Sequence, residues 1–382
     1  MAIKFRADQI GSFLRPPEVH QARSAFAEGR ITLDALRAVE DTAVIEVLGI
    51  QRRSGIGIYS DGEQRRSGWA ADFGEAVSGF VPGDPPVPRP SMGGVETSTP
   101  APAGPVGSTG RVIGGKLVSQ RRLTEYESGF LKSQVAGLPY KVTMPAASYV
   151  IARGYKPGVT DLIYADRKAA LDAAVSIIRT EIEALIAEGV PYIQLDNPHY
   201  PDYISEERCE QWRAIGIDPD QALLEDIEAD NSSIAGFHGP DVTLAMHFCR
   251  GNSGGGGWHT AGGYDRIAEQ IFSSLNVDTF LLEYDSKRAG TFEPLRFMPK
   301  GRTVTLGLVT TKAAQLESED TLLSRIDEAS KFVAIEDLAL SPQCGFASTL
   351  QGNPLTTDDE QRKLELVVAT ATKVWGAIQQ AG

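Results

Sequence analysis

Four side chains of this 382-residue sequence could together bind a metal ion. His247 and Cys249 are two residues apart in the apolar run TLAMHFCRGN, so on a strand both side chains would point to the same face. Glu283 lies near the end of the run TFLLEYD, and Cys344 lies near the end of LALSPQCGF. Thiolate, imidazole and carboxylate groups are typical ligands of Zn2+. We therefore expect a zinc site if the fold brings the ends of these runs together.

Packing is the alternative role for these cysteines, because a buried cysteine often serves packing alone. A single His-x-Cys pair is likewise a weak signal of metal binding. However, two of the only three cysteines lie at the ends of apolar runs, which favours the metal site. Cys209 lies in the helical segment ISEERCEQW and is expected to pack in the interior.

The expected zinc chemistry is the activation of a thiol. A thiol ordinarily titrates at about pH 8.5, whereas a thiol that coordinates a metal is deprotonated. Sulfur-rich ligation lowers the effective positive charge of the metal, which keeps a bound thiolate nucleophilic. Hydrolytic zinc sites more often use a motif such as HExxH, which this sequence lacks. We therefore favour thiol activation over hydrolysis.

Eight short apolar runs must position these side chains. They span residues 7–13, 55–63, 140–148, 191–198, 243–252, 279–285, 303–312 and 338–346. Segments with helical spacing lie between them, at residues 32–48, 160–188, 262–275, 319–334 and 358–379. This alternation indicates a parallel sheet, and eight units indicate an α/β fold with a single (β/α)8 TIM barrel. A doubly wound sheet is the alternative, but no glycine-rich phosphate-binding motif follows the first run.

One segment interrupts the alternation after the second run. Residues 79–115 are dense in proline and glycine, and we expect an insertion loop over 79–118 within a single domain of residues 1–382. Part of this insertion, near 95–118, is expected to be a hairpin. Loops that follow strands lie at the mouth of a barrel, where chemistry occurs. The insertion could therefore cover the active site, or it could be a loop without a role there.

The composition narrows the class of protein. The formal net charge is −13, from 37 Lys and Arg against 50 Asp and Glu, and such a balance disfavours nucleic acid and anionic membranes as partners. No signal peptide or membrane span is expected, and three cysteines are too few for a disulfide framework. We expect a cytoplasmic protein. A homo-oligomer stays open, because the sequence says little about oligomeric state.

Several motifs together resemble the cobalamin-independent methionine synthases, in particular their carboxy-terminal zinc-bearing barrel. The matching segments are Ile10-Gly11-Ser12-Phe13, Gly62-Glu63 with Arg66, Phe73-Gly74-Glu75, Gly79-Phe80, Gln194-Leu195-Asp196 before Pro198, His247-x-Cys249, Glu283 and Pro342-x-Cys344-Gly345. They run along nearly the whole chain. The resemblance implies that His247, Cys249, Glu283 and Cys344 bind zinc.

The same resemblance implies a binding site for the amino-acid part of homocysteine, the expected thiol substrate. It would be formed by Ile10, Gly11, Ser12, Glu63 and Asp196. Two carboxylates suit an ammonium group, and backbone N–H groups near Ser12 suit a carboxylate. Helix capping or a salt bridge is the alternative role for Asp196, and Arg66 is expected to be a structural partner of a carboxylate.

The sequence departs from the family where the methyl donor would bind. The full-length synthases have an additional amino-terminal barrel, and this chain is expected to have one barrel. Residues 142–147 lack the tryptophan that contacts the pterin, and Thr310-Thr311-Lys312 replaces the histidine thought to assist protonation of the folate. The donor, folate or corrinoid-bound, therefore stays open. His199, His259 and Lys312 are candidate proton donors by position alone.

These features lead to one expected function and two alternatives. We expect a zinc-dependent thiol S-methyltransferase that transfers a methyl group to homocysteine. A thiol–epoxide transferase related to the epoxyalkane:coenzyme M transferases is the first alternative. A metal-free barrel is the second, either a decarboxylase of the uroporphyrinogen type or a non-catalytic binding protein.

Overall fold

Six parallel strands form the central sheet of the computed structural model, which describes residues 4–89, 91–93 and 110–376. Their order is β3 (Lys141–Pro145), β4 (Tyr192–Asp196), β5 (Thr243–Phe248), β6 (Thr279–Glu283), β7 (Thr303–Val309) and β8 (Leu338–Pro342). Every residue of these strands is buried. Burial on both faces explains why the strands are nearly continuous apolar runs in the sequence.

The first two apolar runs close the sheet into a barrel. Ala7 forms a parallel bridge to Leu340 of β8, and Tyr59 forms one to Tyr140 at the start of β3. The backbone N–H of Asp8 donates to the carbonyl of Leu340 at 2.9 Å. The first two runs therefore occupy the positions of the missing two strands, and the predicted (β/α)8 barrel is confirmed.

These two runs were expected to be full strands, and the structure reduces each to a single bridge. The backbone turns out of the extended conformation at Gly11 (φ 139°), Gly62 (φ 68°) and Glu63 (φ 54°). Positive φ interrupts a regular ladder. The two runs still contact each other, because the N–H of Phe13 donates to the carbonyl of Gly62 at 3.0 Å.

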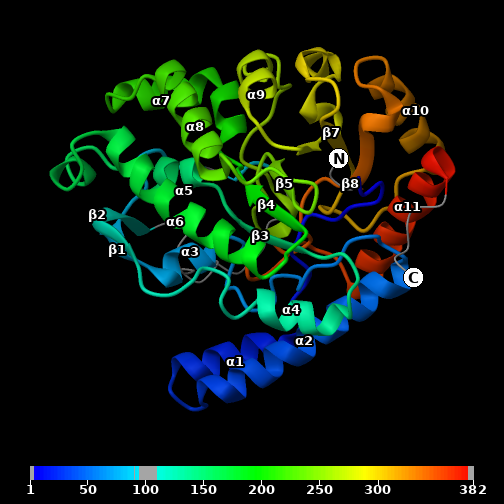
Figure 1. Ribbon diagram of the computed structural model, residues 1–382, viewed down its shortest axis with the longest axis horizontal. Coiled ribbons are helices and arrows are strands. Elements are labelled where there is room, and N and C mark those ends of the chain that lie inside the picture. The colour runs from blue at the N-terminus through cyan, green and yellow to red at the C-terminus, as the bar shows by residue number, and fades with distance from the viewer. Residues whose placement is uncertain (1–3, 90, 94–109, 377–382) are drawn as a thin grey trace.

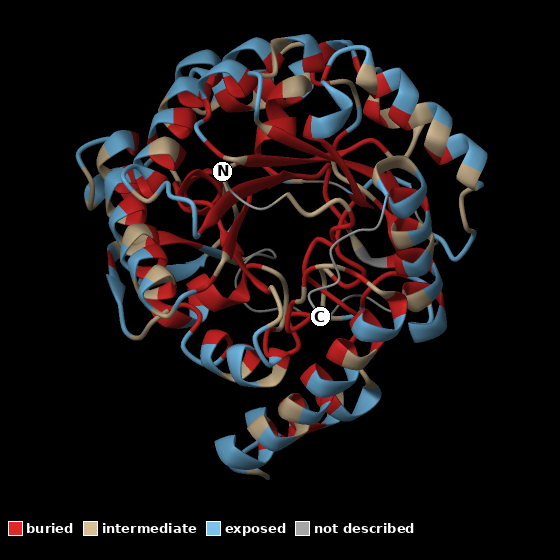
Figure 2. Cartoon of the chain, turned by 45° about the vertical axis from the view of Figure 1, so that its right-hand side comes forward, coloured by how far each residue is buried: buried red, intermediate tan, exposed pale blue. Residues whose placement is uncertain are grey.

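Helices surround the barrel, with buried inner faces and exposed outer faces (Figure 2). The longer ones are α1 (Pro17–Ala27), α2 (Leu33–Ser54), α6 (Arg167–Ala187), α7 (Glu206–Ala214), α8 (Pro219–Ile234), α10 (Glu319–Ser330) and α11 (Thr357–Trp375). The shorter ones include α3 (Ala71–Ala76), α4 (Ser128–Val135), α5 (Ala147–Gly154) and α9 (Ala268–Ser274). The helix expected over 160–188 begins at Arg167, because the Asp166 side chain accepts from the N–H of Ala169 at 2.8 Å and so caps its first turn. None of the helices within the described ranges is long and apolar enough to cross a membrane.

The insertion contains a hairpin that lies at the side of the barrel (Figure 1). Its strands are β1 (Val77–Gly83) and β2 (Gly110–Ser119), paired antiparallel. The second strand falls in the segment expected near 95–118, but the first lies earlier in the sequence. Residues 95–109 of that expected hairpin lie outside the described residues.

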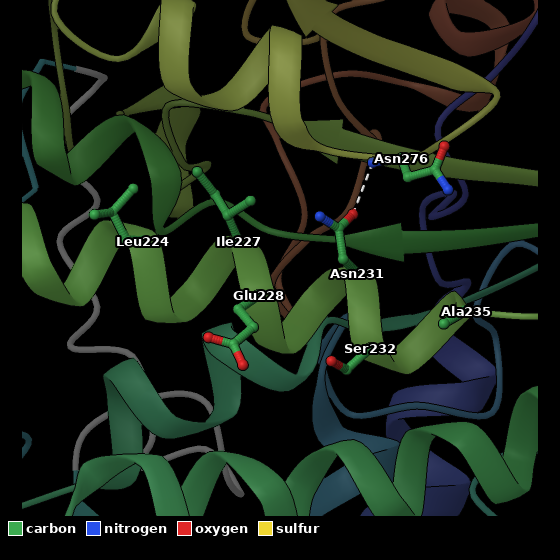
Figure 3. Close-up of a pocket in the computed structure, with 7 residues that line it drawn as sticks. All are labelled: Leu224, Ile227, Glu228, Asn231, Ser232, Ala235 and Asn276. Carbon is green, nitrogen blue, oxygen red and sulfur yellow. Dashed lines mark hydrogen bonds between the residues drawn. The ribbon is translucent and has the colours of Figure 1, made fainter.

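An open pocket lies on the outer wall of the barrel (Figure 3). It is lined mainly by α8, and the N–H of Asn276 donates to the Asn231 side chain there at 2.7 Å. Asn276 precedes β6, so this pocket is at the amino ends of the strands. Barrel enzymes place their chemistry at the carboxyl ends, which directs attention to the other face.

Candidate metal centre

Three of the four predicted ligands lie together at the carboxyl ends of the strands. The imidazole of His247 on β5 and the thiols of Cys249 and Cys344 offer ligand atoms that all lie within 4.8 Å of one another. All three residues are buried. Cys249 directly follows β5 and Cys344 follows β8, so the barrel brings together residues almost a hundred positions apart.

The two nitrogens of His247 are in different environments. Nδ1 is 3.3 Å from the backbone carbonyl of Leu281, whereas Nε2 is buried without a hydrogen-bond partner among the described residues. A proton on Nδ1 would satisfy that carbonyl and leave a lone pair on Nε2. This unpaired nitrogen beside two thiols matches the donor set of a zinc site.

The electrostatics of the two thiols also favour a cation. The neighbouring thiol of Cys249, followed by burial, raises the pKa of Cys344 well above its usual value. Two adjacent thiolates are unfavourable without a positive charge, and a metal ion supplies that charge. The residues present therefore fit a zinc ion.

The fourth predicted ligand, Glu283, lies at the end of β6 but outside this group of three. Its Oε1 accepts from Nη2 of Arg288 at 2.7 Å, and its Oε2 accepts from the backbone N–H of Arg250 at 2.5 Å. Burial alone would raise the pKa of Glu283, but Lys312 and the two arginines lower it. Glu283 is therefore an ionised carboxylate held by cationic residues beside the centre.

Two further carboxyl groups, those of Glu63 and Asp196, lie close to the three-residue group. Asp196 is the register partner of His247 on the neighbouring strand. Burial raises the pKa of Glu63 to about 8, with Arg66 opposing this shift and Asp196 adding to it. Oε2 of Glu63 is buried without a hydrogen-bond partner among the described residues. The pair would be stabilised by a positively charged group between them.

The segment from Ile10 to Ser12 joins these carboxyl groups to the loop after β8. A Cβ atom on Gly11 would lie 2.7 Å from Oε1 of Glu63, and one on Gly345 would lie 1.9 Å from the Ser12 hydroxyl. These close approaches require glycine at both positions. All five predicted substrate residues are thus near one another at the mouth of the barrel.

Asp196 has neither of the alternative roles considered from the sequence. Its Oδ1 accepts from Nε2 of Gln194 at 2.8 Å, and that same amide nitrogen donates to the carbonyl of Ile10 at 2.7 Å. Within the described ranges it forms no ion pair and caps no helix. Arg66, in contrast, has the expected structural role, because its guanidinium pairs with Glu127.

The three candidate proton donors occupy different places. His199 is buried between Asp202 and Asp226, 3.1 and 3.4 Å from their carboxylate oxygens, which is a structural position on the loop after β4. Lys312 donates to the backbone carbonyl of Gly251 at 3.4 Å and is close enough to lower the pKa of Glu283. The ring of His259 packs directly over Gly251.

Several residues that the sequence did not single out support the site. Thr143 donates its hydroxyl proton to Oε1 of Glu63 at 3.0 Å, and Gln194 orients Asp196. Arg250 and Arg288 hold Glu283. No regular spacing in the sequence connects these residues to their partners. Gln194 is the exception, because it lies two residues before Asp196 in the same motif.

The insertion reaches the mouth of the barrel through residues 87–89 and 91–93. Nε of Arg89 donates to the Asp202 carboxylate at 2.8 Å on the loop after β4. Met92 and Trp258 exchange two backbone hydrogen bonds, of 2.7 and 2.9 Å, on the loop after β5. This part of the insertion, named here the strap, therefore connects two loops that border the metal centre.

Comparisons with known proteins agree with this geometry. A family model described as the catalytic domain of cobalamin-independent synthase matches residues 5–84 and 160–371. The uncharacterized protein YxjG of Bacillus subtilis is 36% identical over 372 residues, which cover 97% of this chain and 95% of that protein. The methionine synthase of Pyrococcus abyssi is 23% identical over 341 residues, covering 88% of this chain and 85% of that protein.

Solved structures show the same fold. A structural-genomics target from Listeria monocytogenes, named for vitamin-B12-independent methionine synthase, superposes with a TM-score of 0.75 at 29% identity and covers 99% of this chain and 100% of its own. A protein from Shewanella sp. W3-18-1 has a TM-score of 0.68 at 20% identity, over 97% of this chain and 98% of its own. The family match spans most of the chain, so this protein belongs to the cobalamin-independent methionine synthase family of methyltransferases.

Proposed function

We propose that this protein is a zinc-dependent S-methyltransferase that methylates the thiol of homocysteine. The observation that carries this proposal is the group of His247, Cys249 and Cys344, with its unpaired Nε2 atom. Glu283 is proposed as the fourth ligand, because it is a buried carboxylate at the next strand end. When bound, zinc would supply a Lewis acid that keeps the substrate thiol as a thiolate at neutral pH.

The amino-acid part of homocysteine would lie between the first two runs and β4. Glu63 and Asp196 would bind its ammonium group, and the backbone near Ser12 would bind its carboxylate. Supporting this assignment, the related Shewanella protein was solved in complex with selenomethionine, an analogue of the product. Because Ser12 packs against Gly345, next to Cys344, the bound amino acid would have its sulfur directed towards the metal ligands.

The methyl donor is the less defined half of the reaction. Thr311, in the segment Thr310-Thr311-Lys312 that replaces the family's histidine, is buried and donates its hydroxyl proton to Gln343 at 2.7 Å, so it is a structural residue. General acid catalysis contributes about 10²–10⁴ in rate, and weak turnover with folate is therefore expected. An assay of methyltetrahydrofolate against a methylcobalamin-bearing donor would show which is used, and fast turnover with free folate would contradict this expectation.

X-ray absorption at the zinc edge tests the proposal. The purified protein should contain about one zinc per chain with two sulfur ligands, and homocysteine should add a third sulfur. Coenzyme M is the matched control, because it carries a thiol but no amino-acid group for Glu63 and Asp196. A protein without zinc, or a zinc shell that coenzyme M changes and homocysteine does not, would overturn the proposal.

A further inference from the structure

A buried lysine lies inside the barrel, nearer the amino ends of the strands than the carboxyl groups assigned to the substrate. Lys141 begins β3, and its side chain is 0% exposed. Its ammonium group donates to Oδ1 of Asp8 at 2.7 Å and to Oε1 of Gln194 on β4 at 2.8 Å. A charge in the interior is costly even when it is paired, and the chemistry proposed above does not use this one. The hydrogen bond to Gln194 indicates a role for it.

This hydrogen bond fixes the direction of the Gln194 amide. An ammonium group has donors only, so Lys141 must face the amide oxygen. The amide nitrogen then faces the other way, where it donates to Oδ1 of Asp196 at 2.8 Å and to the carbonyl of Ile10 at 2.7 Å. Both of these partners are acceptors. A reversed amide would place its oxygen against them and its nitrogen against the ammonium group, and all three hydrogen bonds would be lost.

The Gln194 amide contacts both halves of the proposed amino-acid site. Asp196 would bind the ammonium group of homocysteine, and Ile10 begins the segment that would bind its carboxylate. Gln194 and Asp196 are two residues apart on β4, so their side chains point to the same face of the strand. The direction of one amide therefore helps to set the position of both halves.

We propose that Lys141 is a positioning residue for the amino-acid substrate, which orients the Gln194 amide so that this amide holds Asp196 and Ile10 in place for homocysteine. This inference rests on the proposed function, because it needs homocysteine in that site. Within the described ranges, Lys141 has no hydrogen bond or ion pair with His247, Cys249 or Cys344. Its loss should therefore lower the affinity for homocysteine and spare the metal.

A double-mutant cycle of Lys141→Met and Gln194→Met tests this role, with homocysteine affinity measured by calorimetry on the zinc-loaded protein. Lys141→Met allows the amide to reverse, so homocysteine should bind about 10- to 100-fold more weakly, the effect expected from losing a hydrogen bond to a charged group. In the Gln194→Met background no amide remains to be oriented, so the same substitution should change the affinity less than about threefold. Zinc content should equal that of the wild type in all four proteins.

Two further sets of variants separate positioning from a general loss of packing. Tyr192→Phe alters the same buried network by removing the hydroxyl that donates to Asp8 at 3.2 Å. It leaves the bond between Lys141 and Gln194 intact and should keep homocysteine affinity within about twofold of the wild type. Lys141→Met leaves Asp8 as an unpaired buried charge and could fail to fold for that reason. Asp8→Asn combined with Lys141→Met removes the whole pair, which costs less, and should show the same loss relative to Asp8→Asn alone.

The outcomes distinguish this inference from the proposed function. Unchanged homocysteine affinity in Lys141→Met, an equal fall with and without the Gln194 amide, or a loss of zinc from Lys141→Met would overturn the inference and leave the proposed function standing. A wild-type protein that binds no zinc or no homocysteine would overturn both.

Discussion

The thiols of Cys249 and Cys344 lie within 4.8 Å of each other and of the His247 imidazole, so each should be required for metal binding. Cys249→Ser and Cys344→Ser should each weaken zinc binding by more than about 100-fold, because even substitutions beyond the ligands cost about 10- to 100-fold. Zinc content after dialysis against a chelator measures this loss. Cys209→Ser is the matched control, because Cys209 is buried on α7 against the carbonyl of Tyr203. Equal loss from all three variants would contradict the ligand assignment.

The carboxyl groups of Glu63 and Asp196 should determine affinity for the amino-acid part of the substrate. Glu63→Gln and Asp196→Asn should each weaken homocysteine binding and leave zinc content intact, since truncating one side of a buried charged pair costs about 2–5 kcal/mol. Because burial raises the pKa of Glu63 to about 8, binding of an ammonium group should release its proton. Homocysteine affinity should therefore rise between about pH 6 and 8 in the wild type.

Calorimetry in buffers of different ionisation enthalpy would measure that proton release. Glu360→Gln is the control for this experiment, because burial raises the pKa of Glu360 to about 8 as well. Glu360 lies on α11 and its carboxylate accepts from the N–H of Leu14 at 2.7 Å, so we expect it to have no contact with the substrate and to leave the proton release unchanged. The thiol loses its proton in both proteins, so the contribution of Glu63 is the difference in proton release between the wild type and Glu63→Gln. Equal proton release in the two proteins would show that another group binds the ammonium.

At the scale of elements, the sequence predicted best the strands that are buried on both faces. The runs that became β3 to β8 are continuous and apolar, and all six are strands. The first two runs contain Gly11, Gly62 and Glu63, whose positive φ limits them to bridges. The first hairpin strand, Val77–Gly83, was missed because it is only partly buried and has no clear alternation. Strand ends therefore predicted the group of His247, Cys249 and Cys344, but not the residues that contact the candidate site.

The residues of the candidate site also fall into two groups, those that the sequence could predict and those that it could not. His247, Cys249 and Cys344 were predictable because residue type and strand position suffice to recognise them. Arg288 was not, since its contact with Glu283 depends on the turn Lys287–Ala289 and on Trp258 from another loop. Contacts made between loops leave no periodic signal in the sequence.

The first anchor of the strap combines the ion pair of Arg89 with Asp202 and hydrogen bonds from Arg153 and Arg208 to the carbonyls of Val87 and Pro88. We expect the ion pair to contribute most. Arg89→Met removes the partner of Asp202, and breaking a buried pair costs about 3–5 kcal/mol, part of which Arg208 and His199 offset by their proximity to Asp202. The strap should then become accessible to proteases, while the barrel stays intact. Arg111→Met on the hairpin is the control, since the Arg111 side chain contacts Phe80 through a long bond of 3.5 Å to the carbonyl and a cation–π contact with the ring, and forms no hydrogen bond or ion pair with the strap within the described ranges. Equal cleavage rates for wild type and Arg89→Met would show that other contacts hold the strap.

For the whole molecule, burial of carboxyl groups sets the pH dependence of stability. Desolvation raises the pKa of eight carboxyl groups among the described residues, including Glu40, Asp196 and Asp285. The shift is large for five: Asp61 to about 6, Glu63 to about 8, Asp72 to about 7, Asp230 to about 6 and Glu360 to about 8. In this pH range the folded state holds more protons than the unfolded state, so stability falls as pH rises. The loss should begin near the unfolded pKa values of about 4 and end near pH 8. Asp202 has a lowered pKa and acts in the opposite direction, but only at acidic pH.

Glu360 allows this pH dependence to be measured at one residue outside the mouth of the barrel. The wild type should lose stability relative to Glu360→Gln as pH rises from about 5 to 8, because only the wild type must ionise a buried carboxyl group. One pKa unit corresponds to about 1.4 kcal/mol, so the difference between the two proteins should change by at least about 2 kcal/mol across this range. Urea unfolding at pH 5, 6.5 and 8 measures it, and using the difference removes any contribution of bound metal that both proteins share. Parallel stability curves would show that the Leu14 N–H keeps Glu360 ionised at neutral pH and that its burial has little cost.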